Sequence, residues 1–150
     1  MALARLDITI RLAQPGDEEA LAALSGQLGY PSTPEQVRAR WEALAQDGGG
    51  AVYVAEMTGT VIGWAHVQIY PQLVVDRSAE LGGLVVDERY QGRAVGTRLM
   101  EAVERWAYSR GCKSMGVHSN VIRERAHRFY EQLGYERVKN QVVFRKRLSG

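Results

Sequence analysis

The residues with the clearest capacity for chemistry form a small, polar stretch, Gln91-Gly92-Arg93-Ala94-Val95-Gly96-Thr97. It follows an apolar run and opens a segment in which apolar residues recur every three or four positions, which is typical of a helix. The first N–H groups of a helix have no partner inside the helix, and the peptide dipoles place about half a positive charge there. Small residues let a phosphate approach these groups closely. The stretch therefore predicts a pyrophosphate-binding loop, although an ordinary strand-to-helix turn accounts for the same spacing.

Other familiar chemistry is not supported by the sequence. The loop lacks the Gly-Lys-Ser/Thr ending of a Walker motif, and no acidic ribose ligand of a second βαβ unit is evident. The three histidines, His66, His118 and His127, lack metal-ligand spacing, so no metal is predicted. No Ser-His-Asp or Cys-His set stands out, which argues against a hydrolase. Cys112 is the only cysteine, so no internal disulfide can form and a reducing cytoplasm is expected.

The elements that must position the loop follow from periodicity and turn residues. On the N-terminal side we expect two helices, the first with Asp17 as N-cap and the second capped by Ser32 or Thr33. Thr58-Gly59-Thr60 predicts a hairpin turn. The expected strands are 7–12, 51–57, 61–69, 81–86 and 114–118, and the expected helices run through 17–28, 33–44, 95–110 and 123–133. A last hairpin is expected from 135–138 and 141–147 around Lys139-Asn140.

This order of elements predicts an α/β fold in one domain. Hairpins come first and then strands alternate with helices, which indicates a mixed sheet covered by helices on both faces. A chain of 150 residues is long enough for a single core, so we expect one domain spanning 1–150. No apolar run reaches the roughly 18 residues of a membrane span, and the N-terminus lacks the apolar region of a signal peptide.

Two segments resemble the GNAT superfamily of acetyl-CoA-dependent N-acetyltransferases. The stretch from Gln91 to Gly96 is similar to the family's Q/R-x-x-G-x-G/A motif, except that Ala94 stands where the family usually has glycine. The stretch Ala126-His127-Arg128-Phe129-Tyr130-Glu131-Gln132-Leu133-Gly134-Tyr135 resembles the family's A-x-x-F/L-Y-x-x-x-G-F/Y segment. The resemblance implies a mostly antiparallel central sheet with two splayed parallel strands, here 81–86 and 114–118, and the cofactor between them.

The resemblance also implies how acetyl-CoA is held. Leu84 to Val86 would pair with the pantetheine arm like an additional strand, and Gly82-Gly83 would permit a bulge where the ligand approaches. Asn120 stands where the family often has a pantetheine contact, and it serves equally well as a helix N-cap. The cofactor-binding residues expected on this basis are Leu84, Val85, Val86, Gln91, Gly92, Arg93, Ala94, Val95, Gly96, Thr97, Asn120 and Tyr130.

Two catalytic residues follow from the same resemblance. Glu80 corresponds to a strand glutamate that serves some family members as the base, directly or through a water; the alternative is a solvent-facing strand residue. Tyr130 corresponds to the family's tyrosine that meets the sulfur and protonates the departing thiolate. From periodicity alone, Tyr130 belongs to an apolar helix face with Ala126, Phe129 and Leu133 and would be a core residue.

The acceptor is less well defined. Residues 1–88 carry five arginines against twelve acidic residues, a net charge of −7, whereas residues 89–150 carry +9. The positive half suits a polyanionic ligand such as coenzyme A, and it lacks the cues of a nucleic-acid-binding protein; two solvated faces of opposite sign, mated in a dimer, are the alternative. The acidic half, with Asp76 and Glu80, favours a cationic amine, small or peptidic, lined by Tyr30 and Tyr70. The alternative functions are a non-catalytic CoA-binding module and an enzyme for longer acyl chains. Homodimers are common in the family that the sequence resembles, but no residue of this sequence indicates one.

Overall fold

The computed structural model describes residues 7–46, 48–92, 94–119 and 123–150. The chain divides into two compact parts, Met1–Val117 and His118–Gly150, and each is described by itself; the expected single domain stays a prediction. The strands are β1 (Ile8–Leu12), β2 (Gly50–Met57), β3 (Thr60–Ile69), β4 (Ser78–Val86) and β5 (Ser114–Val117). The α-helices are α1 (Glu18–Leu28), α2 (Pro34–Ala45), α3 (Val95–Ser109) and α4 (Glu124–Gln132), with one 3₁₀ turn, η2, at Glu88–Tyr90.

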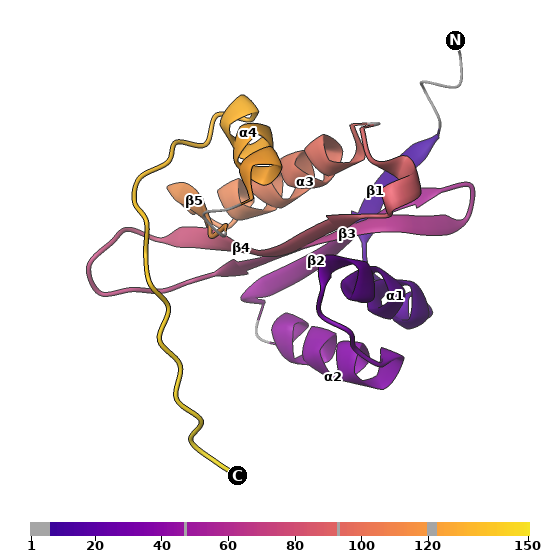
Figure 1. Cartoon of the computed structure of the whole chain (residues 1–150), viewed down its shortest axis with the longest axis horizontal. Coiled ribbons are helices and arrows are strands. Elements are labelled where there is room, and N and C mark those ends of the chain that lie inside the picture. The colour runs from indigo at the N-terminus through magenta and orange to yellow at the C-terminus, as the bar shows by residue number, and fades with distance from the viewer. Residues whose placement is uncertain (1–6, 47, 93, 120–122) are drawn as a thin grey trace. The chain divides into compact units, whose positions relative to one another are not determined.

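The five strands form one mixed sheet in the order β1-β2-β3-β4-β5 (Figure 1). The first four strands pair antiparallel, as expected for strands joined by hairpins and short connections. β4 and β5 pair parallel, from Ser78 opposite Ser114 to Leu81 opposite Val117. The predicted mixed sheet, with a parallel pair formed by the strands on either side of the loop and α3, is therefore confirmed.

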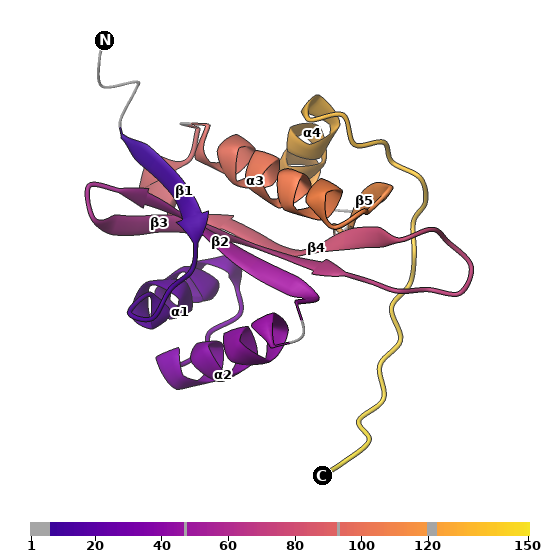
Figure 2. The ribbon, with the colours of Figure 1, turned by 180° about the vertical axis from the view of Figure 1, so that it is seen from behind.

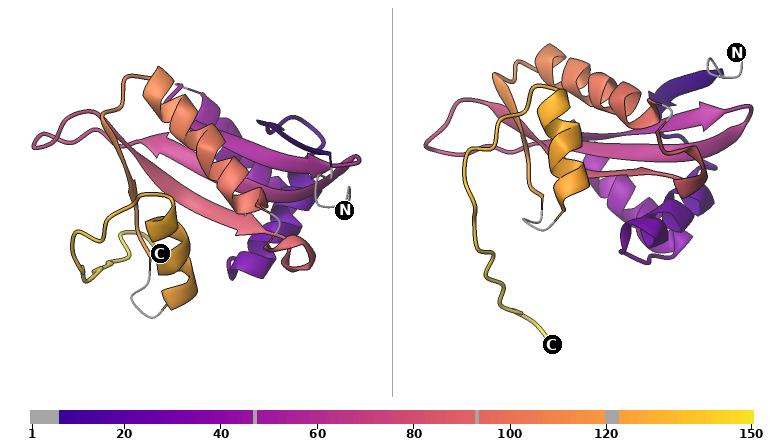
Figure 3. Two further views of the ribbon diagram at one scale, coloured as in Figure 1. Left: turned by 90° about the horizontal axis from the view of Figure 1, so that it is seen from above. Right: turned by 45° about the horizontal axis from the view of Figure 1, so that its top comes forward.

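Helices cover both faces of the sheet in the Met1–Val117 part. α1 and α2 lie on one face and α3 on the other, as Figures 1 and 2 show from opposite sides and Figure 3 from above. On the α1–α2 face, Leu21, Val52 and Val54 form a buried cluster against which Trp41 and Trp64 pack. On the other face, α3 presents a fully buried row that includes Val95, Leu99, Met100 and Val103. The sheet is thus held between two apolar layers, as its alternating strands require.

The two N-terminal helices begin differently from one another. Thr33 caps α2 with a complete capping box: the backbone N–H of Gln36 donates to Oγ1 of Thr33, and the backbone N–H of Thr33 donates to Oε1 of Gln36. Asp17 occupies the N-cap position of α1 but makes no side-chain cap bond. Its carboxylate instead accepts two hydrogen bonds from the Arg11 guanidinium, at 2.8 and 3.1 Å. Asp17 is therefore the N-cap residue, as expected, but its carboxylate binds the Arg11 guanidinium and not the first N–H groups of the helix.

The expected C-terminal hairpin is also wrong. Residues 135–150 contain no helix or strand, and all but Tyr135 are exposed. A tight hairpin turn needs residues that accept positive φ, and Lys139-Asn140 lacks the glycine that usually supplies it. An isolated pair of strands is at best marginally stable in water without an apolar surface to cover it. The β-branched residues of this segment therefore do not suffice to form the hairpin.

Among the described residues, no helix is both long enough and apolar enough to cross a membrane.

Candidate active site

The central feature of the site is the exposed backbone edge of β4. β5 ends at Val117, so its ladder with β4 stops at Leu81, whereas β4 continues to Val86. Within the described residues, the side of 82–86 that faces away from β3 therefore has no partner strand. Unpaired N–H and C=O groups along an edge can bind an extended molecule as an additional strand would. The two parallel strands thus stop pairing beyond Leu81, in the region where 81–86 and 114–118 were expected to separate. The pairing of Leu84 to Val86 with a cofactor stays a prediction.

A β-bulge lies at the start of this free edge. His66 of β3 is opposite Gly83 and Val67 is opposite Leu81, which leaves Gly82 without a counterpart on β3. Both glycines lie beneath aromatic rings: a Cβ atom at Gly82 would overlap the His66 imidazole, and one at Gly83 would lie 2.8 Å from the Trp64 indole. The expected bulge is confirmed, and these two rings explain why both positions require glycine.

Trp64 and His66 are residues of interest that sequence reasoning missed. Both project from β3 toward the α1–α2 face, two residues apart, and Trp64 packs against the buried cluster there. The Nε1 atom of Trp64 and the Nε2 atom of His66 are buried and have no hydrogen-bond partner among the described residues. Burial lowers the pKa of His66, so its imidazole is neutral near pH 7. The sequence did carry a signal for them. Trp64 and His66 alternate along one strand, and the next strand carries two consecutive glycines, Gly82-Gly83, which make room for large rings.

The loop after β4 leaves the first turn of α3 open. Gly92 and Ala94 both have positive φ, 80° and 63°, and Ala94 is the N-cap of α3. The Ala94 methyl group cannot cap the helix, and the first turn of α3 contains no acidic residue. The N–H groups at this end are thus left for an external anion, which is the arrangement that favours a phosphate. The loop residues present therefore fit a pyrophosphate group.

The preceding turn is held in place by hydrogen bonds from side chains. Asp87 is buried, and its carboxylate accepts from the backbone N–H of Arg89 and from the Arg89 guanidinium. These hydrogen bonds lower the pKa of Asp87 below its ordinary value. The Gln91 side chain donates to the carbonyl oxygen of Val86 at 3.2 Å. The turn is thereby fixed to the end of β4, which sets where the loop begins.

Glu80 lies on the α1–α2 face of β4. It is opposite Gln68 of β3, which is two residues beyond His66, so Glu80 and His66 share this face. On the other side Glu80 is opposite Gly116 of β5, and a Cβ atom at Gly116 would lie 2.7 Å from Oε1 of Glu80. The absence of a side chain at Gly116 therefore gives the carboxylate room beside the bulge.

Tyr130 belongs to the His118–Gly150 part and is described within it. Its ring makes edge contacts with Phe129 and Tyr135, with centroids 5.2 and 6.0 Å away. Burial raises the pKa of the Tyr130 phenol above its ordinary value of 10.0, and the Arg123 guanidinium opposes this increase. Tyr130 thus combines the partial burial of a core residue with a phenol that is protonated at neutral pH.

The remaining expected residues lie on separate elements. Tyr30 follows α1 and is 72% exposed, and Tyr70 follows β3 and is 48% exposed. The backbone N–H of Tyr70 donates to the carbonyl oxygen of Ser78, which places Tyr70 two residues from Glu80 along the paired strands. Arg93 and Asn120 lie outside the described residues.

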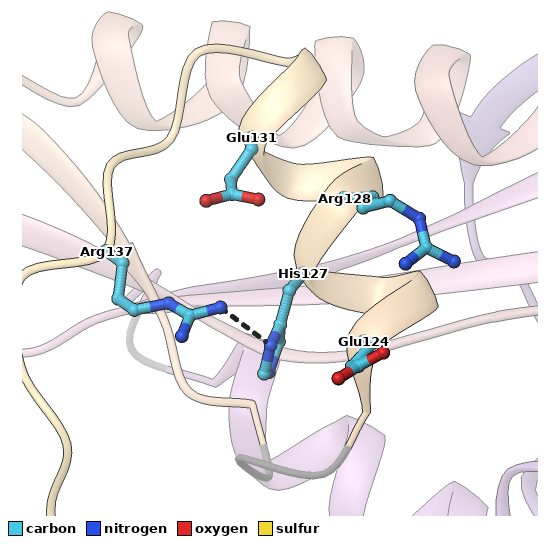
Figure 4. Close-up of a pocket in the computed structure, with 5 residues that line it drawn as sticks. All are labelled: Glu124, His127, Arg128, Glu131 and Arg137. Atoms are coloured by element: carbon cyan, nitrogen blue, oxygen red, sulfur yellow. Dashed lines mark hydrogen bonds between the residues drawn. The ribbon is translucent and has the colours of Figure 1, made fainter.

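Figure 4 shows a shallow hollow within the His118–Gly150 part, lined by Glu124, His127, Arg128, Glu131 and Arg137. The Arg137 guanidinium lies 3.0 Å from Nδ1 of His127. None of the expected site residues lines this hollow. In the part of the chain that the structure describes, no group of three or more histidine, cysteine or acidic side chains could hold a metal ion.

Comparison with known proteins gives a consistent result. The model of the acetyltransferase (GNAT) family matches residues 18–135. An aminoglycoside N(6')-acetyltransferase type 1 from Stenotrophomonas maltophilia is 32% identical over 147 residues, which cover 94% of each chain. A Salmonella typhimurium protein of the same name is 28% identical over 123 residues, which cover 79% of this chain and 85% of the Salmonella protein. The structure of AAC(6')-Iy in complex with the bisubstrate analogue CoA-S-monomethyl-acetylneamine superposes with a TM-score of 0.83 at 25% identity, covering 93% and 98% of the two chains.

A sheet whose parallel strands stop pairing, beside a helix N-terminus without a side-chain cap, is an arrangement that suits an acyl-CoA-dependent transferase. The chain belongs to the acetyltransferase (GNAT) family, and it is an N-acetyltransferase that uses acetyl-CoA.

The conformation of Ala94 leads to a first prediction. Alanine at positive φ is strained by about 1 kcal/mol, and glycine is not. Ala94→Gly should therefore raise the free energy of unfolding, by up to about 1 kcal/mol, in urea titrations. The matched control is Ala102→Gly, the same change in the interior of α3, which should lower it by about 1 kcal/mol. A comparable loss in both variants would contradict the strain.

His66 leads to a second prediction, on pH dependence. Its pKa is lower in the folded protein than the ordinary 6.5, so the unfolded chain binds more protons as the pH falls through 6.5. The free energy of unfolding should therefore decrease from pH 7 to pH 5, and His66→Gln should remove most of this slope. His127→Gln, the same change in the His118–Gly150 part, is the matched control. A wild-type slope that persists in His66→Gln would refute the assignment.

Proposed function

We propose that this enzyme acetylates an aminoglycoside on its 6'-amine. The observation that carries the proposal is the 32% identity to an aminoglycoside N(6')-acetyltransferase over 94% of both chains. The AAC(6')-Iy complex, with its neamine-derived analogue, supports the same acceptor at lower identity. An aminoglycoside is a cationic primary amine, and so satisfies the expectation drawn from charge.

Charge also supports a cationic acceptor. The net charge of −7 over residues 1–88 attracts a polycation and speeds its encounter with the enzyme. Asp76 and Glu80 belong to this acidic half, and we propose that they lie on the acceptor side with Tyr30 and Tyr70. The cytoplasm is the expected location, which the free thiol of Cys112 supports.

For acetyl-CoA, we assign binding to the backbone of two neighbouring segments. The free edge at Leu84, Val85 and Val86 would pair with the pantetheine arm, because amide groups along that arm can complete the ladder. The loop from Gln91 to Thr97 would hold the pyrophosphate through N–H groups at the start of α3. Arg93 and Asn120 remain sequence-based proposals for the same ligand.

The reaction assigns one proton transfer to each catalytic residue. Glu80, directly or through a water, would take a proton from the acceptor ammonium, and the resulting amine would attack the thioester carbonyl carbon. A C–N bond forms and the C–S bond breaks, and the attacking nitrogen loses its second proton to solvent as the amide forms. Tyr130 would give its proton to the departing thiolate, since its phenol is protonated at neutral pH. The acetyl group passes directly to the amine, without a covalent enzyme intermediate.

The test of the acceptor uses a matched pair of substrates. Kanamycin B and kanamycin C differ only in carrying an amine or a hydroxyl at the 6' carbon. With acetyl-CoA, kanamycin B should release free thiol and gain one acetyl group by mass, with kcat/KM at least about 100-fold above that of kanamycin C. Spermidine and a peptide with a free N-terminus serve as further acceptors. Equal rates for the two kanamycins would refute the 6' assignment, and preference for spermidine or peptide would refute the aminoglycoside.

The role of Tyr130 is tested by removing its hydroxyl. Tyr130→Phe should lower kcat by about 10-fold or more, because general acid catalysis is lost, while calorimetry should find acetyl-CoA binding unchanged. The control is Tyr108→Phe, at an 83% exposed position on α3, which should keep the wild-type kcat. If Tyr130→Phe turns over at the wild-type rate, Tyr130 is a structural residue.

A further inference from the structure

The β4–α3 turn, residues 87–90, joins β4 to the proposed phosphate loop, so its position sets the position of the loop. Some of its hydrogen bonds are internal. The backbone N–H of Tyr90 donates to the carbonyl oxygen of Asp87, and the Arg89 guanidinium donates to the Asp87 carboxylate. The backbone N–H of Asp87 donates to the carbonyl oxygen of Ile62 on β3 at 2.7 Å. These bonds give the turn its shape and join it to the sheet.

A further tie to the turn comes from Gln27, in the last turn of α1. Its Oε1 atom accepts a hydrogen bond from the backbone N–H of Glu88 at 3.1 Å, across 61 positions of sequence. Its amide group also donates to the Asp87 carboxylate: the hydrogen bonds from Arg89 lower the pKa of Asp87 most, and the weaker one from Gln27 lowers it further. A glutamine amide suits this place because it carries an acceptor and donors on one group.

The end of α1 is a firm support for this contact. Leu24 is 3% exposed, which anchors the helix to the sheet. Gly29 has a φ of 104°, and its backbone N–H donates to the carbonyl oxygen of Gly26. The backbone N–H of Tyr30 donates to the carbonyl oxygen of Ser25 at 2.9 Å. Because these bonds satisfy carbonyl groups of the last turn, the end of the helix has a defined position.

The same helix end lies beside the free edge of β4. A Cβ atom at Gly83 would lie 3.9 Å from Cδ2 of Leu28, which is an ordinary van der Waals contact. Leu28 and Gln27 are adjacent, so one turn of α1 contacts both the free edge and the β4–α3 turn. Tyr30, proposed above to line the acceptor, follows two residues later. The helix therefore connects the proposed acceptor side to the start of the phosphate loop.

We propose that Gln27 is a positioning residue for acetyl-CoA: it holds the β4–α3 turn, and with it the phosphate loop, against the end of α1. The inference rests on the proposed binding of the pyrophosphate by the loop from Gln91 to Thr97. A loop that is fixed before its ligand arrives loses less conformational freedom on binding. Its position also matters for the reaction, because a small displacement of the reacting groups lowers the rate strongly.

The first test measures the affinity for CoA by calorimetry. Gln27→Ala removes both hydrogen bonds and should weaken CoA binding by about 5-fold. Gln27→Glu keeps the shape but replaces the donor beside Asp87 with a second negative charge, so it should weaken binding more, by about 20-fold. The matched controls are Gln46→Ala and Gln46→Glu, at the exposed C-cap of α2, which should keep the wild-type affinity.

The order of the two Gln27 variants is decisive. A residue that only fills space would tolerate glutamate better than alanine, because glutamate has nearly the shape of glutamine. Binding of CoA by Gln27→Glu as tightly as by Gln27→Ala, or as tightly as by the wild type, would therefore overturn the proposal.

The second test uses a donor without the pyrophosphate. With acetylpantetheine and kanamycin B, Gln27→Ala should keep the wild-type kcat/KM, whereas with acetyl-CoA its kcat/KM should fall by about 5-fold. An equal fall with both donors would show a general effect on the fold and would overturn the positioning role. A wild-type protein that fails to bind CoA would instead refute the proposed cofactor site, so the two failures are distinguishable.

Discussion

The site depends on the point at which β4 and β5 stop pairing. Their parallel ladder ends at Leu81 opposite Val117, and the rest of β4 keeps a free edge toward the loop. A longer β5 would occupy the N–H and C=O groups that an extended ligand needs. The same strand β4 leads into the 3₁₀ turn and α3, so the free edge and the open helix end are connected by a few residues. One short strand therefore creates the opening and sets its position relative to the phosphate loop.

The proposed phosphate loop leaves the start of α3 uncapped at a cost in stability. Ala94 adopts positive φ, which costs energy for any residue with a Cβ atom, and its methyl group leaves the end of α3 uncapped. A serine or aspartate at this position would satisfy an N–H group of the helix and so compete with a phosphate. The surrounding structure supplies the compensation, because Val95, Leu99 and Val103 of α3 are fully buried against the sheet. Packing along the helix thus holds an end that is locally unfavourable.

Sequence alone determined those features that depend on neighbours along the chain. The small residues from Gln91 to Thr97 predict a phosphate loop, because helix ends leave N–H groups free in any tertiary context. The second helix was expected to be capped by Ser32 or Thr33, and Thr33 caps it through a box with Gln36, three residues away. The mixed sheet followed from the order of hairpins and alternating elements. The family followed from two motifs, each of which lies within one strand–loop–helix or helix–turn unit.

Tertiary structure decided which groups meet across strands and which remain unpartnered. Gly82 and Gly83 permitted a bulge, but only the paired β3 strand reveals that the rings of His66 and Trp64 fill the space above them. Asp17 is the N-cap of α1 as expected, but only the folded structure shows that its carboxylate binds Arg11 of β1 and not the helix N–H groups. The C-terminal segment has the composition of a hairpin and forms none, because a strand is stable only when another strand and an apolar surface accompany it. These outcomes depend on contacts between separate elements, from Arg11 and Asp17, six residues apart, to residues on neighbouring strands. Local propensity carries no information about such contacts.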